Sequence, residues 1–482
     1  MRPVAEARSF DWRVLRAVAL ALLAVKLVLL VTARPFMDET YYFLWGQHPA
    51  LSYFDHPPLI GWTQAIAGAV FGWTVLGLRA MVALTLIGDL ALLWLFARRL
   101  AGESWRDTFW PLAVVFLATP IFFGLSSVAL PDHLLIFFAL AALYAFESFR
   151  QSVEAGTPRW RFLYLAAAAI GFATLSKYTG VLLGAGIVVY LVAVPSLRRT
   201  FRSPHLYLAM LLAIAMQAPV LVWNLQHGFA SFGFIVGGRA GLRDLSSLAG
   251  LGGFILGAVA VLSPFLLIPI ARFLLGKRDG HGLARLIFWI STVGFLAASL
   301  FTNILIHWNV IAYLAVLPFL VPYLRSRLLI GAQIAYGALA ILFAAVNYTA
   351  LPVLAIFGPG DQTSAWSYGW DEVEAAIDGA LTTQHVDFIA ATDYALAAPL
   401  AFQLRDRDVT SLSPRREAFD DWFDAEAYRG KSAIIVADRW RPLTDAISGH
   451  FASVDKLTTL TIERFGRRFD VTTLYLGHDF SP

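Results

Sequence analysis

Long apolar runs separated by short polar loops dominate the first 350 residues. A helix needs about 20 apolar residues to cross the hydrocarbon core of a bilayer, and about eleven runs approach that length. A further amphipathic segment near 59–72 is predicted to lie along the membrane surface. The predicted fold of residues 1–350 is therefore an α-helical polytopic membrane domain. Its predicted spans are centred on residues 17–33, 75–97, 109–125, 133–149, 162–176, 180–195, 206–223, 247–271, 284–301, 309–324 and 328–350.

Residues 351–482 have the pattern of a small water-soluble domain. The segment DEVEAAIDGALTTQ predicts a helix whose first turn is favoured by Asp371 and Glu372. DFIAATDY and SAIIVADR each place a short apolar run before a polar turn, as buried strands do, and ALAAPLAFQLRD and RPLTDAISGHF predict the helices that follow them. The tail predicts a hairpin that turns at Gly466. Alternating elements of this kind predict an α/β domain.

The charges in the loops predict the orientation of the chain. Every loop in one alternating set is basic, and such loops face the cytoplasm. With an odd number of spans, the N-terminus is then cytoplasmic and the C-terminal domain is periplasmic or extracellular, in a bacterial inner (plasma) membrane. The six loops hold Arg2, Arg8, Arg13 and Arg16; Arg98, Arg99 and Arg106; Arg150, Arg159 and Arg161; Arg198, Arg199 and Arg202; Arg272, Lys277, Arg278 and Arg285; and Arg325 and Arg327.

Composition agrees with this picture and excludes several classes of function. The 482 residues are 58% hydrophobic and only 15% charged, well below the charged fraction of soluble domains. The absence of cysteine excludes disulfides, thiolate metal sites and thiol nucleophiles. The basic residues are spread over short loops, so they do not form a nucleic-acid-binding patch, and no phosphate-binding glycine loop is present.

The first outer loop is unusually rich in polar and aromatic residues. Residues 34–62 combine the acids Asp38, Glu39 and Asp55 with two histidines and eight aromatic residues. The other loops on this side add further acids, histidines and isolated cations, whereas structural charges would be expected on both sides. This asymmetry predicts a functional site on the outer face. The added residues include Asp132 and His133, Lys177 and Tyr178, Asn224 and His227, Arg239, Arg243 and Asp244, and His307.

Three of these stretches carry a resemblance to a known family. DETYY…YFDHPPL, LPDHLLIFF and SKYTGVL together resemble the GT-C-type glycosyltransferases, in the bacterial branch related to protein O-mannosyltransferases and to the lipid A aminoarabinose transferase. The likeness covers about residues 10–350. It implies an enzyme that transfers a sugar from a polyprenyl-phosphate carrier to a lipid, glycan or protein acceptor on the outer face. The aminoarabinose branch favours Gly after the lysine, and Tyr178 stands there instead, so that sugar is not assigned.

The resemblance also implies roles for individual residues. Asp38 corresponds to the acid after the first span and is the candidate general base. Asp132 corresponds to a second acid at the outer end of the fourth span, and Lys177 to a basic residue that binds the carrier phosphate.

The chemistry of sugar transfer adds further candidates. A carboxylate must accept the proton of the attacking hydroxyl, cations must stabilise the departing phosphate, and nearby carboxylates favour an oxocarbenium-like transition state. The candidates for catalysis are thus Asp38, Glu39 and Asp55. The candidates for binding the sugar and the donor are Asp132, His56, Tyr42 and Tyr178. The candidates for binding the carrier phosphate are Lys177, Arg239 and Arg243, and Arg79 is another outer-face cation.

Two questions stay open at the level of sequence. A divalent metal is possible, with His56, His227 and His307 as candidate ligands, although interfacial histidines more often bond to backbone or headgroups. A transporter or lipid flippase is the leading alternative function, and a non-catalytic glycan-binding protein is a third. Transporters usually carry charges near mid-membrane in repeated halves, and neither feature is evident in this chain.

Overall fold

The computed structural model describes residues 11–235, 248–276, 281–302, 304–324, 326–356, 362–405 and 407–482. The described chain divides into two compact units. Unit 1 comprises Met1–Leu30, Leu51–Ile60 and Met81–Ile341, and unit 2 comprises Val31–Ala50, Gly61–Ala80 and Leu342–Pro482. Most of the first outer loop is thus grouped with the C-terminal residues, whereas the sequence assigned that loop to the membrane part.

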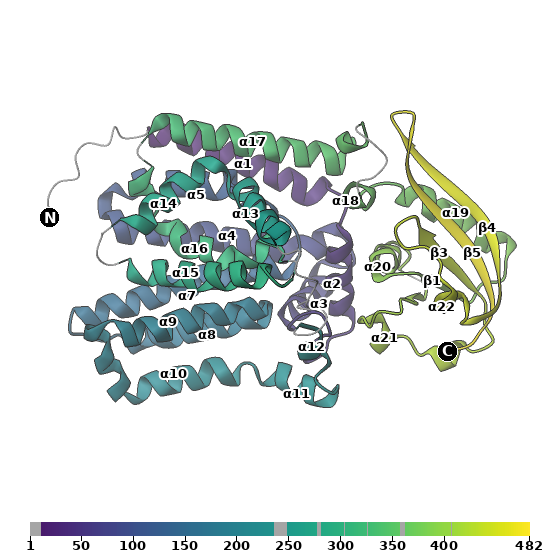
Figure 1. Cartoon of the computed structure of the whole chain (residues 1–482), viewed down its shortest axis with the longest axis horizontal. Helices are drawn as coiled ribbons and strands as arrows, with labels where there is room; N and C mark the ends of the chain where they lie inside the picture. The colour runs from purple at the N-terminus through teal and green to yellow at the C-terminus, as the bar shows by residue number, and fades with distance from the viewer. Residues whose placement is uncertain are drawn as a thin grey trace. The chain divides into compact units, whose positions relative to one another are not determined.

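Unit 1 is helical, and helices cover all eleven predicted spans. In Figure 1, α7, α8, α9 and α10 run roughly parallel or antiparallel to one another. The helices, some of which extend into unit 2 at one end, are α1 (Trp12–Thr32), α4 (Val75–Ala101), α5 (Trp105–Ala118), α6 (Pro120–Leu125), α7 (Pro131–Glu154), α8 (Trp160–Ser176), α9 (Val181–Ala193), α10 (Pro204–Ala215), α11 (Ala218–Gln226), α12 (Ala230–Gly233), α13 (Leu248–Leu262), α14 (Pro264–Leu275), α15 (Gly282–Ser299), α16 (Val310–Val316) and α17 (Arg327–Thr349).

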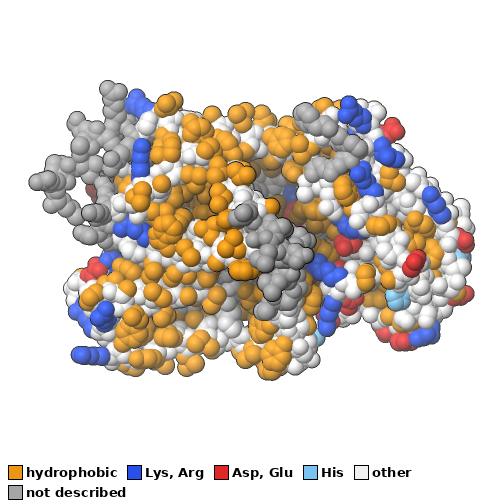
Figure 2. All heavy atoms as spheres, viewed as in Figure 1, with side chains coloured by type: hydrophobic (Ala, Val, Ile, Leu, Met, Phe, Trp, Pro, Cys, Tyr) orange, Lys and Arg blue, Asp and Glu red, His pale blue; other side chains and the backbone are white. Residues whose placement is uncertain are grey.

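The surface of these helices is suited to lipid. Figure 2 shows hydrophobic side chains spread over the helices on the face in view. On α10, for example, Leu211 and Ile214 are 60% and 65% exposed. A water-soluble surface rarely tolerates so extensive an apolar area, whereas a bilayer requires it. The protein is therefore a multi-pass membrane protein.

The number of spans depends on how short and bent helices are counted. Among the described residues, six helices are long and apolar enough to cross a membrane, or eight if each of two sharply bent pairs is one span. The predicted number of about eleven also counted α8 and the segment 309–324, which are too short by this measure. It also counted 109–125 as a span of its own, whereas residues Val75–Ala118 form one continuous stretch in the structure. Eleven spans therefore stay a prediction, as does their orientation.

One bend has a clear local cause. The chain turns by 100° between α13 and α14, where Ser263 has a φ of 77° and Pro264 begins the next helix. The Ser263 hydroxyl accepts a hydrogen bond from the Phe265 amide at 3.2 Å, which caps α14. A proline cannot continue the preceding helix but fits the first turn of a new one, so the sequence Ser-Pro fixes the break.

Unit 2 contains a five-stranded sheet in the order β2-β1-β3-β5-β4. Strand β1 pairs in parallel with β2 and β3, whereas β5 is antiparallel to both β3 and β4. The strands are β1 (Phe388–Ala391), β2 (Val409–Ser411), β3 (Ala433–Asp438), β4 (Phe451–Arg464) and β5 (Arg467–Phe480). The helices are α2 (Met37–Gln47), α3 (Leu59–Phe71), α18 (Gln362–Ala365), α19 (Trp370–Thr383), α20 (Tyr394–Gln403), α21 (Phe419–Trp422) and α22 (Asp445–Ser448).

The predicted α/β domain is confirmed in most of its elements. The two apolar runs form β1 and β3, every residue of which is buried, and the tail forms the long β4–β5 hairpin seen in Figure 1. Its turn contains Phe465 and Gly466, both at positive φ. Two details differ: β2 was not predicted, because three residues carry almost no periodicity, and the helix predicted over RPLTDAISGHF shrinks to the four residues of α22.

Candidate functional site

The predicted site residues fall into both units. Asp38, Glu39, Tyr42 and Arg79 belong to unit 2, while the described candidates Asp55, His56, Asp132, Lys177, Tyr178, His227 and His307 belong to unit 1. Arg239 and Arg243, predicted to bind the carrier phosphate, lie outside the described residues.

Helix α2 places two adjacent acids in its first turn. Pro35 and the extended backbone of Phe36 precede the helix, and Asp38 and Glu39 follow at its start. Unpaired amides and the helix dipole at this end favour negative charge. The Glu39 carboxylate accepts a hydrogen bond from the Phe36 amide at 2.9 Å, which stabilises the start of the helix.

Glu39 is also held by Arg79, near the start of α4. The guanidinium donates from Nε to Oε1 at 2.9 Å and from Nη2 to Oε2 at 2.7 Å, which is a bidentate pair. Arg79 further donates to the carbonyl oxygens of Ala33 at 2.8 Å and Arg34 at 3.3 Å. Glu39 is 0% and Arg79 is 4% exposed. This network favours a structural role for both residues, which anchor the segment before α2 to α4.

Asp38 has different surroundings. It is only partly buried, and its Oδ1 accepts a hydrogen bond from the Tyr394 hydroxyl at 3.2 Å. Tyr394 is the first residue of α20, whose N-cap Asp393 bonds to the Ala395 amide at 2.9 Å. The ring of Tyr394 also lies 4.7 Å from that of Tyr41, centroid to centroid. Tyr394 was not predicted, because nothing in the sequence near residue 394 shows that it meets a residue 356 positions earlier.

Aromatic residues of α2 pack against the C-terminal segment within unit 2. The Tyr41 hydroxyl accepts a hydrogen bond from the Ala418 amide at 2.8 Å, and its ring lies 6.1 Å from Phe419. The ring of Tyr42, a predicted sugar-binding residue, is buried and meets Trp45 edge-on at 4.9 Å. The dense aromatic pattern of the first loop is therefore used largely for packing around Asp38.

In unit 1, α7 and α8 bring together Asp132 and Lys177. The two helices are consecutive and antiparallel, so the start of α7 and the end of α8 lie at the same level. The Lys177 ammonium donates to Asp132 Oδ1 at 2.8 Å and to Oδ2 at 2.9 Å. The residues are 5% and 2% exposed. An uncompensated charge in such a position would be very costly, so the pair is a strong constraint on the fold.

Histidines flank this pair. His133 is fully buried; its Nδ1 is 2.9 Å from the Thr85 hydroxyl, and its Nε2 has no hydrogen-bond partner in the described structure. His307 is close enough to interact electrostatically with Asp132. Asp55 and His56, from the first loop, are buried in the same unit. Tyr178, next to Lys177, shares a hydrogen bond of 2.9 Å with the Ser231 hydroxyl.

The described histidines do not form a metal site. No group of three or more His, Cys, Asp or Glu side chains is arranged to hold a metal ion within the described ranges. His227 stacks on Trp223 with ring centroids 4.0 Å apart, and its Nδ1 lies 2.8 Å from the Trp223 carbonyl oxygen, so that nitrogen acts as a donor rather than a ligand. These residues do not fit the proposed metal, and no step of the chemistry is assigned to one.

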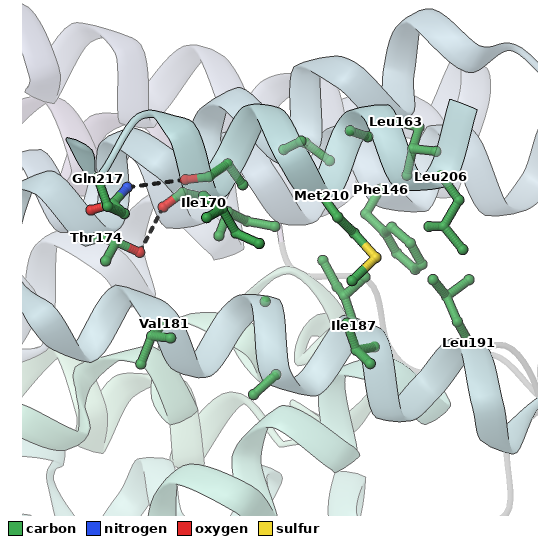
Figure 3. A pocket seen from close by; sticks show the side chains of 18 residues that line it. Phe146, Leu163, Ile170, Thr174, Val181, Ile187, Leu191, Leu206, Met210 and Gln217 are labelled. Carbon is green, nitrogen blue, oxygen red and sulfur yellow. Dashed lines mark hydrogen bonds between the residues drawn. The ribbon is translucent and has the colours of Figure 1, made fainter. Parts of the chain in front are cut away.

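An apolar cavity of about 270 Å³ lies among α8, α9 and α10 in unit 1. Figure 3 shows Thr174 and Gln217 at one end of it and Leu191, Leu206 and Phe146 at the other. The two polar side chains donate to backbone carbonyl oxygens of α8, Thr174 to Ile170 at 2.9 Å and Gln217 to Gly171 at 3.1 Å. Thr174 precedes Lys177 by about one helical turn, although neither Lys177 nor Asp132 lines the cavity.

Comparisons with known proteins bear on the family and the fold of the chain. Residues 55–223 match the family described as dolichyl-phosphate-mannose-protein mannosyltransferase. The chain is 24% identical over 392 residues to the lipid A galacturonosyltransferase RgtD of Rhizobium johnstonii, covering 77% of this chain and 78% of that protein.

The fold is similar to that of ArnT from Cupriavidus metallidurans bound to undecaprenyl phosphate, with a TM-score of 0.60 and 16% identity over 96% of this chain and 97% of ArnT. The apo form of ArnT matches with the same TM-score and coverage at 17% identity. The predicted fold class, a helical membrane protein with a small C-terminal sheet domain, is thereby confirmed. Together, the family match, the relative and the shared fold support a membrane glycosyltransferase of the GT-C type.

Proposed function

We propose that the protein transfers a sugar from a polyprenyl-phosphate donor to a lipid acceptor, such as lipid A, on the periplasmic face of the inner membrane. The observation that carries the proposal is the contrast between two neighbouring acids. Glu39 is fully buried and bound on both oxygens by Arg79, whereas Asp38 stays partly exposed and receives a hydrogen bond from Tyr394. Of the two, Asp38 is the more exposed and therefore the better placed to meet a substrate.

In this proposal Asp38 is the general base. The hydroxyl of the acceptor has a pKa far above neutral, so a carboxylate must accept its proton as the oxygen attacks the anomeric carbon. The first turn of α2 favours the ionised form of Asp38, and the Tyr394 hydroxyl fixes one oxygen so that the other keeps a defined direction. Glu39 and Arg79 act indirectly, because they hold the start of the helix in place.

Lys177 would bind the phosphate of the carrier. As the glycosidic bond breaks, the polyprenyl phosphate gains negative charge, which a preplaced ammonium stabilises. Asp132 holds the ammonium in position before the donor arrives and would share it with the phosphate afterwards. Asp55 stays a candidate for stabilising positive charge on the sugar, and His56 and Tyr178 for sugar contacts.

The apolar cavity beside Lys177 supports a lipid-linked donor. It is lined mainly by aliphatic side chains of α8, α9 and α10, with Phe146 of α7, and its polar end is one turn from the lysine. A polyprenyl chain needs such an apolar surface, and its phosphate needs a cation at one end. This arrangement is less expected for a transporter, which usually places its charges near mid-membrane.

The test is sugar transfer in detergent from a labelled polyprenyl-phosphate sugar, where transport cannot be scored. Asp38→Asn is expected to lower the rate about 10²- to 10⁴-fold, since it removes the base but keeps the shape of the side chain. Asp378→Asn, an exposed acid on α19, is the matched control and should behave like the wild type. Wild-type turnover by Asp38→Asn would refute the assignment of the base, and no sugar transfer by the wild type with any polyprenyl donor would refute the function.

A further inference from the structure

A second cavity, of about 470 Å³, is lined wholly by residues of unit 2, and Asp38 is not among them. Its walls come from the C-terminal end of α2, Trp73, the segment after α20, β2, and the stretch from α21 to Tyr428. This volume is typical of pockets for small ligands. The question is which ligand its side chains would recognise.

The walls are strongly aromatic. His48, at the end of α2, stacks on Trp422 with ring centroids 4.4 Å apart and an interplanar angle of 13°. Trp422 also meets Phe419 edge-on at 5.3 Å, and Phe423 stacks on Tyr428 at 4.9 Å. Aromatic faces set beside polar groups suit amphipathic ligands such as sugar rings, whose C–H faces stack on them while their hydroxyls form hydrogen bonds.

The cavity also carries uncommitted positive charge. Arg405 and Arg407 line it, both are exposed, and neither side chain forms a hydrogen bond or ion pair with any residue in the described part of the chain. Two carboxylates, Asp408 and Asp424, also line the cavity, and both have partners within the chain: Asp408 accepts a hydrogen bond from the Tyr428 hydroxyl and Asp424 accepts one from the Ala427 amide. Guanidinium groups bind carboxylates and phosphates in a bidentate manner, so an anionic ligand fits better than a neutral one.

A buried hydroxyl points to a ligand independently. Thr410, on β2, lines the cavity and is 2% exposed, and its Oγ1 has no hydrogen-bond partner among the described residues. Buried polar atoms without partners are rare in folded proteins and call for an explanation. A hydroxyl of a bound sugar would supply the missing partner.

The length of α2 separates this cavity from Asp38. His48 follows Asp38 by ten residues, which corresponds to about 15 Å along a helix. A sugar at the His48 end of the cavity, stacked on Trp422, is therefore too far from Asp38 to be the one that reacts. It would belong to a part of the acceptor remote from the attacking hydroxyl.

We propose that this cavity binds an anionic saccharide, a sugar ring bearing a phosphate or a carboxylate, and that it thereby selects the acceptor. Trp422 would stack on the ring, Arg405 and Arg407 would bind the anionic group, and Thr410 would bond to a ring hydroxyl. The identity of the site as an acceptor site rests on the proposed function, whereas the binding of an anionic sugar does not.

The binding test uses the full chain in detergent and ligand-detected NMR saturation transfer. Glucosamine 1-phosphate, galacturonic acid and glucose are titrated separately, which distinguishes a phosphate from a carboxylate and both from a neutral ring. Binding of at least one anionic sugar, at least tenfold tighter than glucose, is expected. The double variant Arg405→Gln/Arg407→Gln should lose that preference, while Arg468→Gln, an exposed arginine on β5 outside the cavity, should keep it. Equal binding of all three sugars, no binding at all, or an unaffected double variant would overturn the proposal.

A second measurement separates this proposal from the proposed function. Asp38→Asn should bind the anionic sugar as the wild type does, so a failure of catalysis leaves the binding result intact. In the transfer assay, the double arginine variant should raise the apparent KM for the acceptor about tenfold with kcat and the donor KM unchanged. A change confined to the donor KM would overturn the assignment to the acceptor. Both arginines are exposed, so an unchanged melting temperature is expected and shows that the variant is folded.

Discussion

Two buried ion pairs, one in each unit, show how similar charges are used differently. Glu39–Arg79 in unit 2 forms a closed network, because the guanidinium also binds two carbonyl oxygens and the carboxylate also binds a backbone amide. Asp132–Lys177 in unit 1 joins an acid to a compact ammonium, next to a fully buried histidine, His133, whose Nε2 has no partner in the described structure.

The difference lies in the two cations. An arginine whose donors are bound to protein atoms cannot bind a substrate without breaking the fold. A compact ammonium can share the carboxylate that holds it with a phosphate. In the proposed function the first pair is structural and the second binds substrate, and the following predictions test this division.

The largest effect is expected from removing the cation of the structural pair. Arg79→Gln leaves the Glu39 carboxylate buried and uncompensated, and such a change costs about 3–5 kcal/mol of unfolding free energy. Adding Glu39→Gln should restore little, because the carbonyl oxygens of Ala33 and Arg34 would still lack their donor. Thermal unfolding in detergent measures both variants, with Arg468→Gln as control. A double variant as stable as the wild type would show that the network is not structural.

A third buried carboxylate, that of Glu417, should respond to pH. Burial, together with the nearby carboxylates Asp393 and Asp420, raises the pKa of Glu417 to about 8. Both of its carboxyl oxygens lack hydrogen-bond partners in the described structure. In the unfolded chain the pKa of Glu417 is near 4.3. Between about pH 4.5 and 8 the folded state therefore holds a proton on Glu417 that the unfolded state has lost, so the free energy of unfolding falls as pH rises through this range.

Glu417→Gln should remove this dependence. The variant is expected to be more stable than the wild type by roughly 4 kcal/mol at pH 8 and about equally stable at pH 4. Unfolding of both proteins in detergent across this pH range checks the sign. A wild type that becomes more stable between pH 5 and 8, relative to the variant, would contradict the assignment of a protonated Glu417.

The substrate-binding pair should affect the donor rather than the fold when both charges are removed together. Lys177→Gln/Asp132→Asn avoids an uncompensated buried charge, so the melting temperature should change little. The apparent KM for the polyprenyl-phosphate donor should rise about tenfold, since one charge-assisted interaction with phosphate is lost. Steady-state kinetics with varied donor measures it, and an unchanged donor KM would remove Lys177 from phosphate binding.

The smallest effect concerns the hydrogen bond to Asp38. Tyr394→Phe removes one donor from the carboxylate but keeps the ring that packs on Tyr41. The rate is expected to fall about threefold at neutral pH, and the acid limb of the pH–rate profile should move to higher pH, because a hydrogen bond to the charged form had favoured ionisation. A purely structural role would lower the melting temperature and leave the profile where it is.

The sequence by itself determined the helices and the small C-terminal domain. Apolar runs of span length and the alternation of short strands and helices are local features, and local sequence determines them because backbone hydrogen bonds in helices and turns close within a few residues. The break at Ser263 was missed, since residues 247–271 were predicted as one span. The resemblance in the first loop and in LPDH and SKYTG proposed Asp38, Asp132 and Lys177 as site residues without any coordinates.

Only the tertiary structure decided which partner each charge has. Glu39 and Arg79 are 40 residues apart in the chain, Asp132 and Lys177 are 45 apart, and Asp38 and Tyr394 are 356 apart. No local sequence pattern encodes contacts over such separations. The cavity lined by Trp422, Arg405 and Thr410 likewise arises from segments that are separate in the chain. Burial and partners set what a charged group can do, and both are properties of the packed structure rather than of the residue type.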